Sequence, residues 1–154
     1  MIKILFICHG NICRSPMAEF FMKDIVAKRG ISEEFFIASA ATSREEIGNP
    51  IYPPVRRIID AKGIDYRGKT AIQVTKADYE KYDYLICMDS NNVRNLLRIV
   101  NDDKDKKIFK LLDFTNYGGD VADPWYTGDF SSTEHDVEAG CEGLLQHILD
   151  SKQI

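Results

Sequence analysis

Short apolar runs alternate along the chain with segments of mixed polarity. Residues 2–7 and 84–88 are almost continuously apolar, which is typical of strands buried on both faces. Residues 35–38 and 107–111 are expected to form two further strands. Between the strands, apolar residues recur three and four positions apart, as they do along helices that bury one face.

Capping residues mark the ends of the expected helices. Pro16 suits the first turn of a helix because its missing N–H needs no partner there, and Gly30 suits the end of that helix. Asp89 is expected to cap another helix that runs through residue 99. The remaining helices are expected over residues 53–63, after a capping box at 75–78, and from 131 to 149, with a long loop over 112–130.

Strands that alternate with helices pair in parallel through right-handed crossovers. The chain is therefore predicted to be an α/β protein, a doubly wound four-stranded parallel sheet with helices on both faces. Ligands of such sheets bind at the carboxyl ends of the strands, and Cys8 stands at one of these ends. No repeat or linker interrupts the 154 residues, so a single domain over 1–154 is expected.

Composition narrows the possible partners and the compartment. A formal charge of −4 and a pI near 5.4 argue against nucleic-acid binding. The first residues carry no secretory signal pattern, and no apolar run approaches the roughly 18 residues of a membrane span, so no membrane association is expected. Four scattered cysteines do not form a disulfide framework, which favours a reducing, cytoplasmic location.

The strongest chemical signal is Cys-His-Gly-Asn-Ile-Cys-Arg-Ser at residues 8–15. A cysteine attacks phosphorus as a thiolate, and a helix N-terminus or a nearby cation lowers a thiol pKa from ~8.5 to roughly 3.5–7.5. Backbone N–H groups of such a loop can surround an anion, and Gly10 is expected to make its tight, unusual turn. Arg14 can hold two phosphoryl oxygens, and Ser15 can donate to the Cys8 sulfur.

The Cys-x5-Arg spacing alone is unspecific, but here the cysteine ends a strand and Ser-Pro opens a helix. Residues 10–16 resemble the signature of the low-molecular-weight protein tyrosine phosphatases. The likeness covers essentially the whole chain and continues at 39–43, 46–50, 73–76, 87–89 and 123–126. It implies a flavodoxin-like fold, no metal and no cofactor, and hydrolysis of aryl phosphates such as protein phosphotyrosine. Cys8 would be the nucleophile and Arg14 the phosphate clamp.

Four aspartates lie in the expected loop before the last helix. The leaving tyrosinate has a conjugate acid with a pKa near ~10, so an acid must protonate it as the bond breaks. Asp123 precedes Pro124, which stiffens the loop, and the resemblance implies that Asp123 is the general acid and later activates water. Asp113, Asp120 and Asp129 are interpreted as capping or solvated residues.

Further residues are expected to line or support the site. Asn11 and Ser39 resemble the family pair that holds the phosphate loop open by a hydrogen bond. Trp125 and Tyr126 are expected to wall a pocket for a phenyl ring, with plain packing as the alternative. The other residues expected to bind phosphate or line the rim are His9, Gly10, Ile12, Cys13 and Ser15.

Three positions add qualifications to the resemblance. In the family, the cysteine equivalent to Cys13 can trap an oxidised nucleophile as a disulfide; a packed thiol is the alternative. Residues 69–72 read Lys-Thr-Ala-Ile where relatives often carry His-x-Ala-Arg, so support for Asn11 and Ser39 is expected to differ. Glu45 stands where some relatives have an aromatic wall, which would disfavour acidic peptides.

Several other functions fit the same residues less well. A zinc site lacks a second ligand pair, and an arsenate reductase would need another redox cysteine pair. Protein-arginine phosphatases typically carry threonine where this chain has Ile12. A catalytically inactive phosphotyrosine-binding module would not need Cys8, Arg14 and Asp123 together. The expected partner is a tyrosine-phosphorylated protein, a cognate tyrosine kinase being the natural one to seek, and the chain is expected to be a monomer or weak homo-oligomer.

Overall fold

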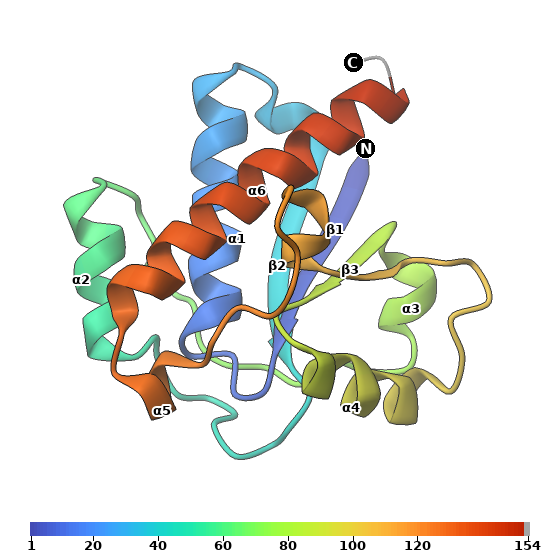
Figure 1. The fold of residues 1–154 in the computed structure, drawn as a ribbon, viewed down its shortest axis with the longest axis horizontal. Coiled ribbons are helices and arrows are strands. Elements are labelled where there is room, and N and C mark those ends of the chain that lie inside the picture. Colours follow the sequence, from blue (N-terminus) through green and yellow to red (C-terminus); the bar gives the residue numbers. More distant parts are fainter. Residues whose placement is uncertain (153–154) are drawn as a thin grey trace.

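The computed structural model describes residues 1–152, in which a four-stranded sheet lies between two layers of helices (Figure 1). The strands are β1 (Ile2–Cys8), β2 (Phe35–Ala41), β3 (Tyr84–Cys87) and β4 (Ile108–Lys110). The helices are α1 (Arg14–Lys28), α2 (Pro53–Ala61), α3 (Asp78–Lys81), α4 (Ser90–Val100), α5 (Pro124–Thr127) and α6 (Phe130–Lys152), with 3-10 turns η1 (Ser32–Glu34) and η2 (Leu111–Phe114). All strand pairs are parallel in the order β2-β1-β3-β4, which confirms the predicted fold class.

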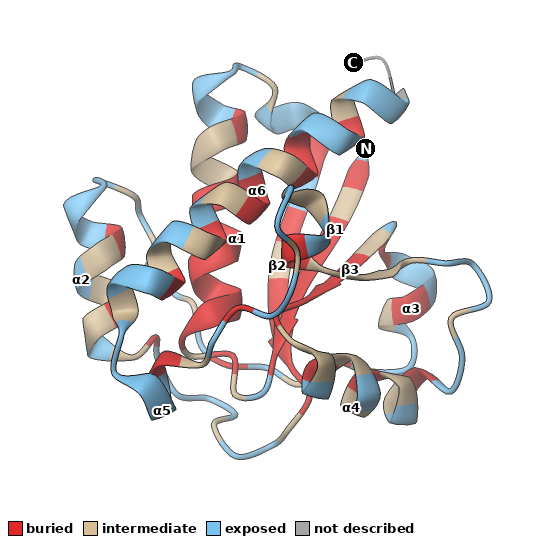
Figure 2. Ribbon diagram, in the orientation of Figure 1, coloured by how far each residue is buried: buried red, intermediate tan, exposed pale blue. Residues whose placement is uncertain are grey.

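Strand β1 lies at the centre of the sheet and is buried on both faces. Ile4 and Phe6 belong to the core beneath α1, α2 and α6. Leu5 and Ile7 point to the opposite face and pack with residues of α3 and α4. This two-sided burial, visible as the red course of β1 in Figure 2, explains why the strand is continuously apolar.

Helix α6 packs very closely against η2, the turn that follows β4. A Cβ atom on Gly140 would lie 2.3 Å from Leu111 Cγ, and one on Gly143 would lie 2.1 Å from the Phe114 carbonyl oxygen. Neither position has room for a side chain, so glycine is required by the close approach. The contact fixes the start of the segment that leads from β4 toward Asp123.

Helix α4 begins as the sequence predicts. The Asp89 side chain accepts a hydrogen bond from the Asn92 backbone N–H at 2.8 Å, and Asn92 Oδ1 accepts one from the Asp89 backbone at 3.1 Å. Leu96 and Val100 bury one face of the helix against the sheet. Across residues 1–152, no helix is both long and apolar enough to span a membrane.

Some local predictions were wrong in detail. Strand β2 extends to Ala41 because its ladder with β1 continues to the Cys8–Ala41 pair. Only half of the capping box at residues 75–78 forms: the Asp78 carboxylate accepts a hydrogen bond from the Thr75 backbone N–H, but α3 begins at Asp78 and has no side-chain cap. The expected loop over 112–130 contains most of η2 and the short helix α5.

Candidate active site

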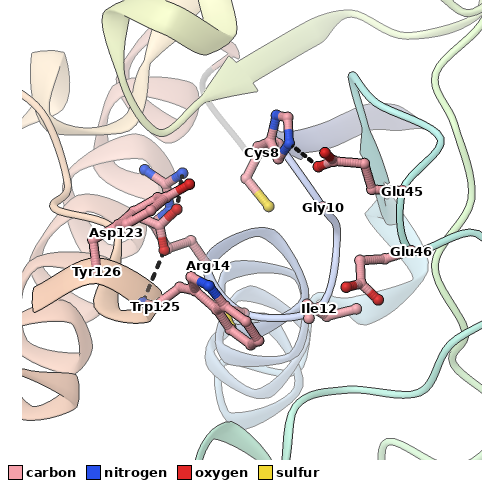
Figure 3. A pocket seen from close by; sticks show the side chains of 11 residues that line it. Cys8, Gly10, Ile12, Arg14, Glu45, Glu46, Asp123, Trp125 and Tyr126 are labelled. Atoms are coloured by element: carbon pink, nitrogen blue, oxygen red, sulfur yellow. Dashed lines mark hydrogen bonds and ion pairs between the residues drawn. The ribbon is translucent and has the colours of Figure 1, made fainter. Parts of the chain in front are cut away.

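The carboxyl ends of the strands form one edge of the sheet, and a pocket of about 360 Å³ opens there. Strand β1 lies between β2 and β3, the point at which the strand order reverses and where doubly wound sheets bind ligands. Segments far apart in the chain line this pocket (Figure 3): Cys8, His9, Gly10, Ile12, Cys13, Arg14, Glu45, Glu46, Asp123, Trp125 and Tyr126.

Residues 8–15, here called the Cys8 loop, join β1 to α1 around the Cys8 sulfur. The sulfur points into the pocket in Figure 3, 3.0 Å from Ser15 Oγ, and accepts the Asn11 backbone N–H at 3.3 Å. The left-handed residue of the loop is Asn11, with φ of 60°, so the prediction that Gly10 makes the unusual turn was wrong. A Cβ on Gly10 would lie 3.4 Å from Glu46 Cγ, an ordinary van der Waals contact, so the loop and the opposite rim are close neighbours at this point.

The Arg14 guanidinium is buried and held on three sides. Its Nη1 donates to Asp89 Oδ2 at 2.7 Å and to the Val121 carbonyl oxygen at 2.9 Å, while Nη2 lies 3.5 Å from Asp123 Oδ2. Burial alone would lower the pKa of Arg14, but the Cys8 sulfur and the Asp89 carboxylate outweigh burial and raise it. Arg14 therefore stays charged and is pre-oriented at the mouth of the Cys8 loop.

Asp89 has a second role that the sequence reasoning missed. One carboxylate oxygen caps α4 and the other holds Arg14, which lies 75 positions away in the chain. A usable signal existed, because Asp89 follows β3, the direct neighbour of β1, at the edge where ligands bind.

Residues 120–126, here called the Asp123 loop, bring a carboxylate to the pocket from 109 positions beyond Arg14. Asp123 Oδ1 accepts the Trp125 backbone N–H at 3.0 Å, which directs Oδ2 toward Arg14. Trp125 packs against Tyr52 with ring centroids 5.0 Å apart, although 55% of its surface remains exposed. Tyr126 is 84% exposed, so the aromatic wall of the pocket is largely open to solvent.

The other three aspartates of the segment 112–130 have separate structural roles. Asp113 accepts the Lys110 backbone N–H at the start of η2, and Asp129 accepts the Ser132 N–H in the first turn of α6. Asp120 is more than a solvated residue: Lys110 Nζ lies 3.0 Å from its Oδ1 and Ser90 Oγ 3.3 Å. Burial opposes the shift, but these two partners lower the pKa of Asp120. They tie the Asp123 loop to β4 and α4.

The Asn11 side chain connects the Cys8 loop to β2 and to the segment after residue 69. Its Nδ2 donates to Ser15 Oγ at 2.7 Å and to Ser39 Oγ at 3.0 Å, and its Oδ1 accepts the Ile72 backbone N–H at 3.2 Å. Asn11 and Ser39 thus meet as the sequence suggested. Beyond them the Ser39 hydroxyl donates to Glu19 Oε1 at 2.6 Å, a buried carboxylate in α1 that the sequence reasoning did not single out.

The remaining rim is polar and acidic. His9 pairs with Glu45 across the pocket from the aromatic wall, with Glu46 beside them. Cys13 is buried at the pocket's inner edge, and burial together with the nearby Cys8 and Asp123 raises its thiol pKa to about 12. The four cysteines, all within the described residues, are unlinked by disulfides. Within residues 1–152, no three His, Cys, Asp or Glu side chains gather so as to hold a metal ion.

Comparison with known proteins decides the family. The sequence model described as "Low molecular weight phosphotyrosine protein phosphatase" matches residues 3–154. The chain belongs to this family. Among the family's curated members, the low molecular weight protein-tyrosine-phosphatase YfkJ of Bacillus subtilis is 38% identical over all of both chains. PtpA of Staphylococcus epidermidis, which bears the same description, is 37% identical, covering 97% of this chain and 95% of its own.

Solved structures of the family agree with the fold. The crystal structure of YfkJ matches with a TM-score of 0.94 and 39% identity, covering 99% of this chain and 97% of its own. The Streptococcus pyogenes phosphatase SP-PTP matches at 0.86 and 43%, covering 96% and 93%. A Drosophila arginine phosphatase also superposes at 0.86 with coverage of 96% and 98%, but at 24% identity it shares only the fold.

Proposed function

We propose that the protein hydrolyses phosphotyrosine on other proteins through a cysteinyl-phosphate intermediate. The observation that supports this most directly is the convergence of the Cys8 sulfur, the Arg14 guanidinium and the Asp123 carboxylate on one pocket with an aromatic wall. A nucleophile, an anion clamp and a proton donor are the three groups that the reaction requires.

In the first step the Cys8 thiolate attacks phosphorus, and an S–P bond forms as the P–O bond to tyrosine breaks. The electron pair of that bond goes to the phenolic oxygen, which takes a proton from the Asp123 carboxyl group. Arg14 and backbone N–H groups of the Cys8 loop, of which that of Asn11 points at the Cys8 sulfur, stabilise the charge on the non-bridging oxygens.

In the second step a water molecule attacks the phosphorus of the intermediate. Asp123, now a carboxylate, takes a proton from this water as the O–P bond forms. The S–P bond breaks, its electron pair returns to the Cys8 sulfur, and inorganic phosphate leaves. Ser15 Oγ, 3.0 Å from the sulfur, can stabilise the thiolate as attacking group and as leaving group.

The walls of the pocket favour an aryl substrate. Trp125 and Tyr126 offer ring faces, and Ile12 adds an apolar side chain to the lining. Glu45 and Glu46 on the other rim would disfavour acidic residues beside the phosphotyrosine. The proposed partner is a tyrosine-phosphorylated protein in the cytoplasm, such as a cognate tyrosine kinase. Phosphoarginine is the alternative substrate, because an arginine phosphatase shares the fold.

The test is turnover of a phosphotyrosine peptide with trapping of the intermediate. Acid quenching of the working enzyme should leave phosphate on Cys8, located by peptide mass mapping. Cys8→Ser should lose at least about 10⁴-fold in kcat yet still bind phosphate, and Arg14→Lys should lose about 10²–10³-fold because the planar fork is gone. Appreciable turnover by Cys8→Ser would overturn the covalent mechanism. A higher kcat/KM for phosphoarginine would overturn the substrate.

A further inference from the structure

Lys69 is a largely buried cation behind the Cys8 loop. Its side chain is 11% exposed, and its Nζ donates to the Ser39 carbonyl oxygen at 2.9 Å and lies 3.7 Å from Glu19 Oε1. Glu19 is itself buried and also receives Lys23 Nζ at 2.6 Å, but 43% of the Lys23 side chain is in solvent. Burying a charge costs free energy unless the charge is paired. The Lys69–Glu19 pair therefore requires a structural or functional explanation.

The Glu19 carboxylate sets the direction of the hydrogen bonds that lead away from it. A carboxylate only accepts, so the single hydroxyl hydrogen of Ser39 points to Glu19. Ser39 Oγ must then accept from Asn11, which turns the amide so that Nδ2 faces Ser39. The Ile72 N–H on Asn11 Oδ1 agrees with this orientation.

The same amide orientation determines what Ser15 can do. Asn11 Nδ2 gives its second hydrogen to Ser15 Oγ, so the Ser15 hydroxyl hydrogen remains available for the Cys8 sulfur. If the Asn11 amide were reversed, Ser15 would donate to the amide oxygen instead, and the sulfur would lose a donor. Hydrogen bonds to a charged acceptor are the stronger kind, so this donor matters to the thiolate.

We propose that Lys69 is a positioning residue for catalysis: together with Glu19 it keeps the chain of hydrogen bonds from Ser39 through Asn11 in the direction that lets Ser15 donate to Cys8. The inference rests on the proposed function, in which Cys8 is the nucleophile. Lys69 touches neither the substrate nor the sulfur. Burial lowers the pKa of the Lys69 ammonium, as does Lys23, while Glu19 and Cys8 oppose the shift.

Lys69→Met removes the charge while keeping a similar side-chain length. We expect kcat for a phosphotyrosine peptide to fall about tenfold, the loss of one charge-assisted hydrogen bond. The inhibition constant of inorganic phosphate should change by less than about twofold, because Arg14 still clamps the anion. Lys23→Met is the matched control, since it removes the exposed cation from the same carboxylate, and it should stay within about twofold of the wild type. An equal loss in both variants would overturn the assignment to Lys69.

A double-mutant cycle with Ser15→Ala decides whether Lys69 acts through Ser15. Without the Ser15 hydroxyl the direction of the hydrogen bonds no longer matters. Adding Lys69→Met to Ser15→Ala should therefore lower kcat by less than a further factor of about two. Losses that multiply would overturn the proposal and leave Lys69 a merely structural residue. If Lys69→Met does not fold, Glu19→Gln takes its place in the same cycle, because an amide can donate to Ser39 and reverse the chain.

The two proposals fail in different ways. Activity that survives in Cys8→Ser would overturn the proposed function itself. If Cys8→Ser is inactive but the kcat losses of Lys69→Met and Ser15→Ala multiply in the double-mutant cycle, only the proposed role of Lys69 is overturned.

Discussion

The Cys8 loop and the Asp123 loop meet in one pocket but are held there by different means. In the Cys8 loop Asn11, Arg14 and Ser15 are 1%, 2% and 0% exposed, and each is bonded to buried groups. The Asp123 loop is anchored by the buried residues Val121 and Pro124, and the Val121 backbone N–H donates to the Met88 carbonyl oxygen at 2.9 Å. It nevertheless carries two of the most exposed aromatic side chains among the described residues, and the ion pair of Asp120 with Lys110 that ties it to β4 is partly exposed.

This difference matches the role of each loop in the proposed mechanism. An anion clamp works because its donors are oriented before the substrate arrives, so the Cys8 loop benefits from burial. The proton donor must admit a bulky aryl group, and exposed segments with few buried contacts open at lower free energy. Changes in the Asp123 loop should therefore affect activity in a manner that depends on the substrate, whereas changes in the Cys8 loop should affect every substrate.

The largest effect that separates the two loops is expected from Asp123→Asn. Turnover of phosphotyrosine should fall about 10²–10³-fold, because the leaving phenolate then departs without a proton. The loss should shrink steadily for aryl phosphates with more acidic phenols. The measurement is kcat/KM across a series of substituted phenyl phosphates.

Asp129→Asn is the control for this series, because Asp129 caps α6 and lies in the same part of the chain. It should leave the dependence on the leaving group unchanged. A uniform loss across the series in Asp123→Asn would contradict its assignment as general acid.

A smaller effect is expected from Lys110→Met, which removes the partner of Asp120 and loosens the Asp123 loop. Ion pairs this exposed contribute up to about 1 kcal/mol, so phosphotyrosine turnover should fall only about two- to fivefold. Aryl phosphates with good leaving groups should be unaffected. Lys104→Met, which breaks an exposed pair with Glu80 elsewhere, is the control. An equal loss for good and poor leaving groups would mean that Lys110 does not act through the acid.

The effect on activity at neutral pH is smallest for the last prediction, which concerns the pH dependence of stability on the buried side of the pocket. The thiol pKa of Cys13 is raised to about 12 by burial and neighbouring charges, and burial raises those of Cys87 and Cys141 as well. In the unfolded chain these thiols lose their protons near ~8.5, so above that pH the unfolded state binds fewer protons. The contribution of these thiols to the free energy of unfolding should therefore be constant below about pH 8 and fall as the pH rises further.

Urea unfolding at pH 7 to 10 measures this dependence. Replacing Cys13 with alanine should make the total decrease in the free energy of unfolding between pH 7 and pH 10 smaller by about 1–2 kcal/mol, whatever the variant's stability at pH 7. A slope identical to that of the wild type would mean that Cys13 ionises as readily in the folded protein as in the unfolded chain.

Local predictions succeeded where a few neighbouring residues decide the structure. Asp89 caps α4 as expected because both halves of the capping box lie within four residues. The box at 75–78 formed only in part, since a helix of only four residues is stabilised mainly by tertiary packing, here the burial of Tyr79. Gly10 was expected to hold the unusual backbone conformation, but Asn11 adopts it. The reason is not local, because the Asn11 side chain is held by hydrogen bonds to Ser39 and Ile72, far away in the chain.

The sequence by itself determined the doubly wound sheet and the position of Cys8 at its ligand-binding edge. It also carried the likeness to the family, since apolar periodicity and an eight-residue loop are local patterns. The resemblance pointed to Asp123 among the four aspartates, but only the tertiary structure showed that Asp123 faces Arg14 and that Asp89 holds the same guanidinium. The contact of Lys69 with Glu19 behind the Cys8 loop was likewise visible only in the tertiary structure. Such charged contacts join segments from different helices and loops, so they depend on strand order and side-chain direction, which no stretch of neighbouring residues specifies.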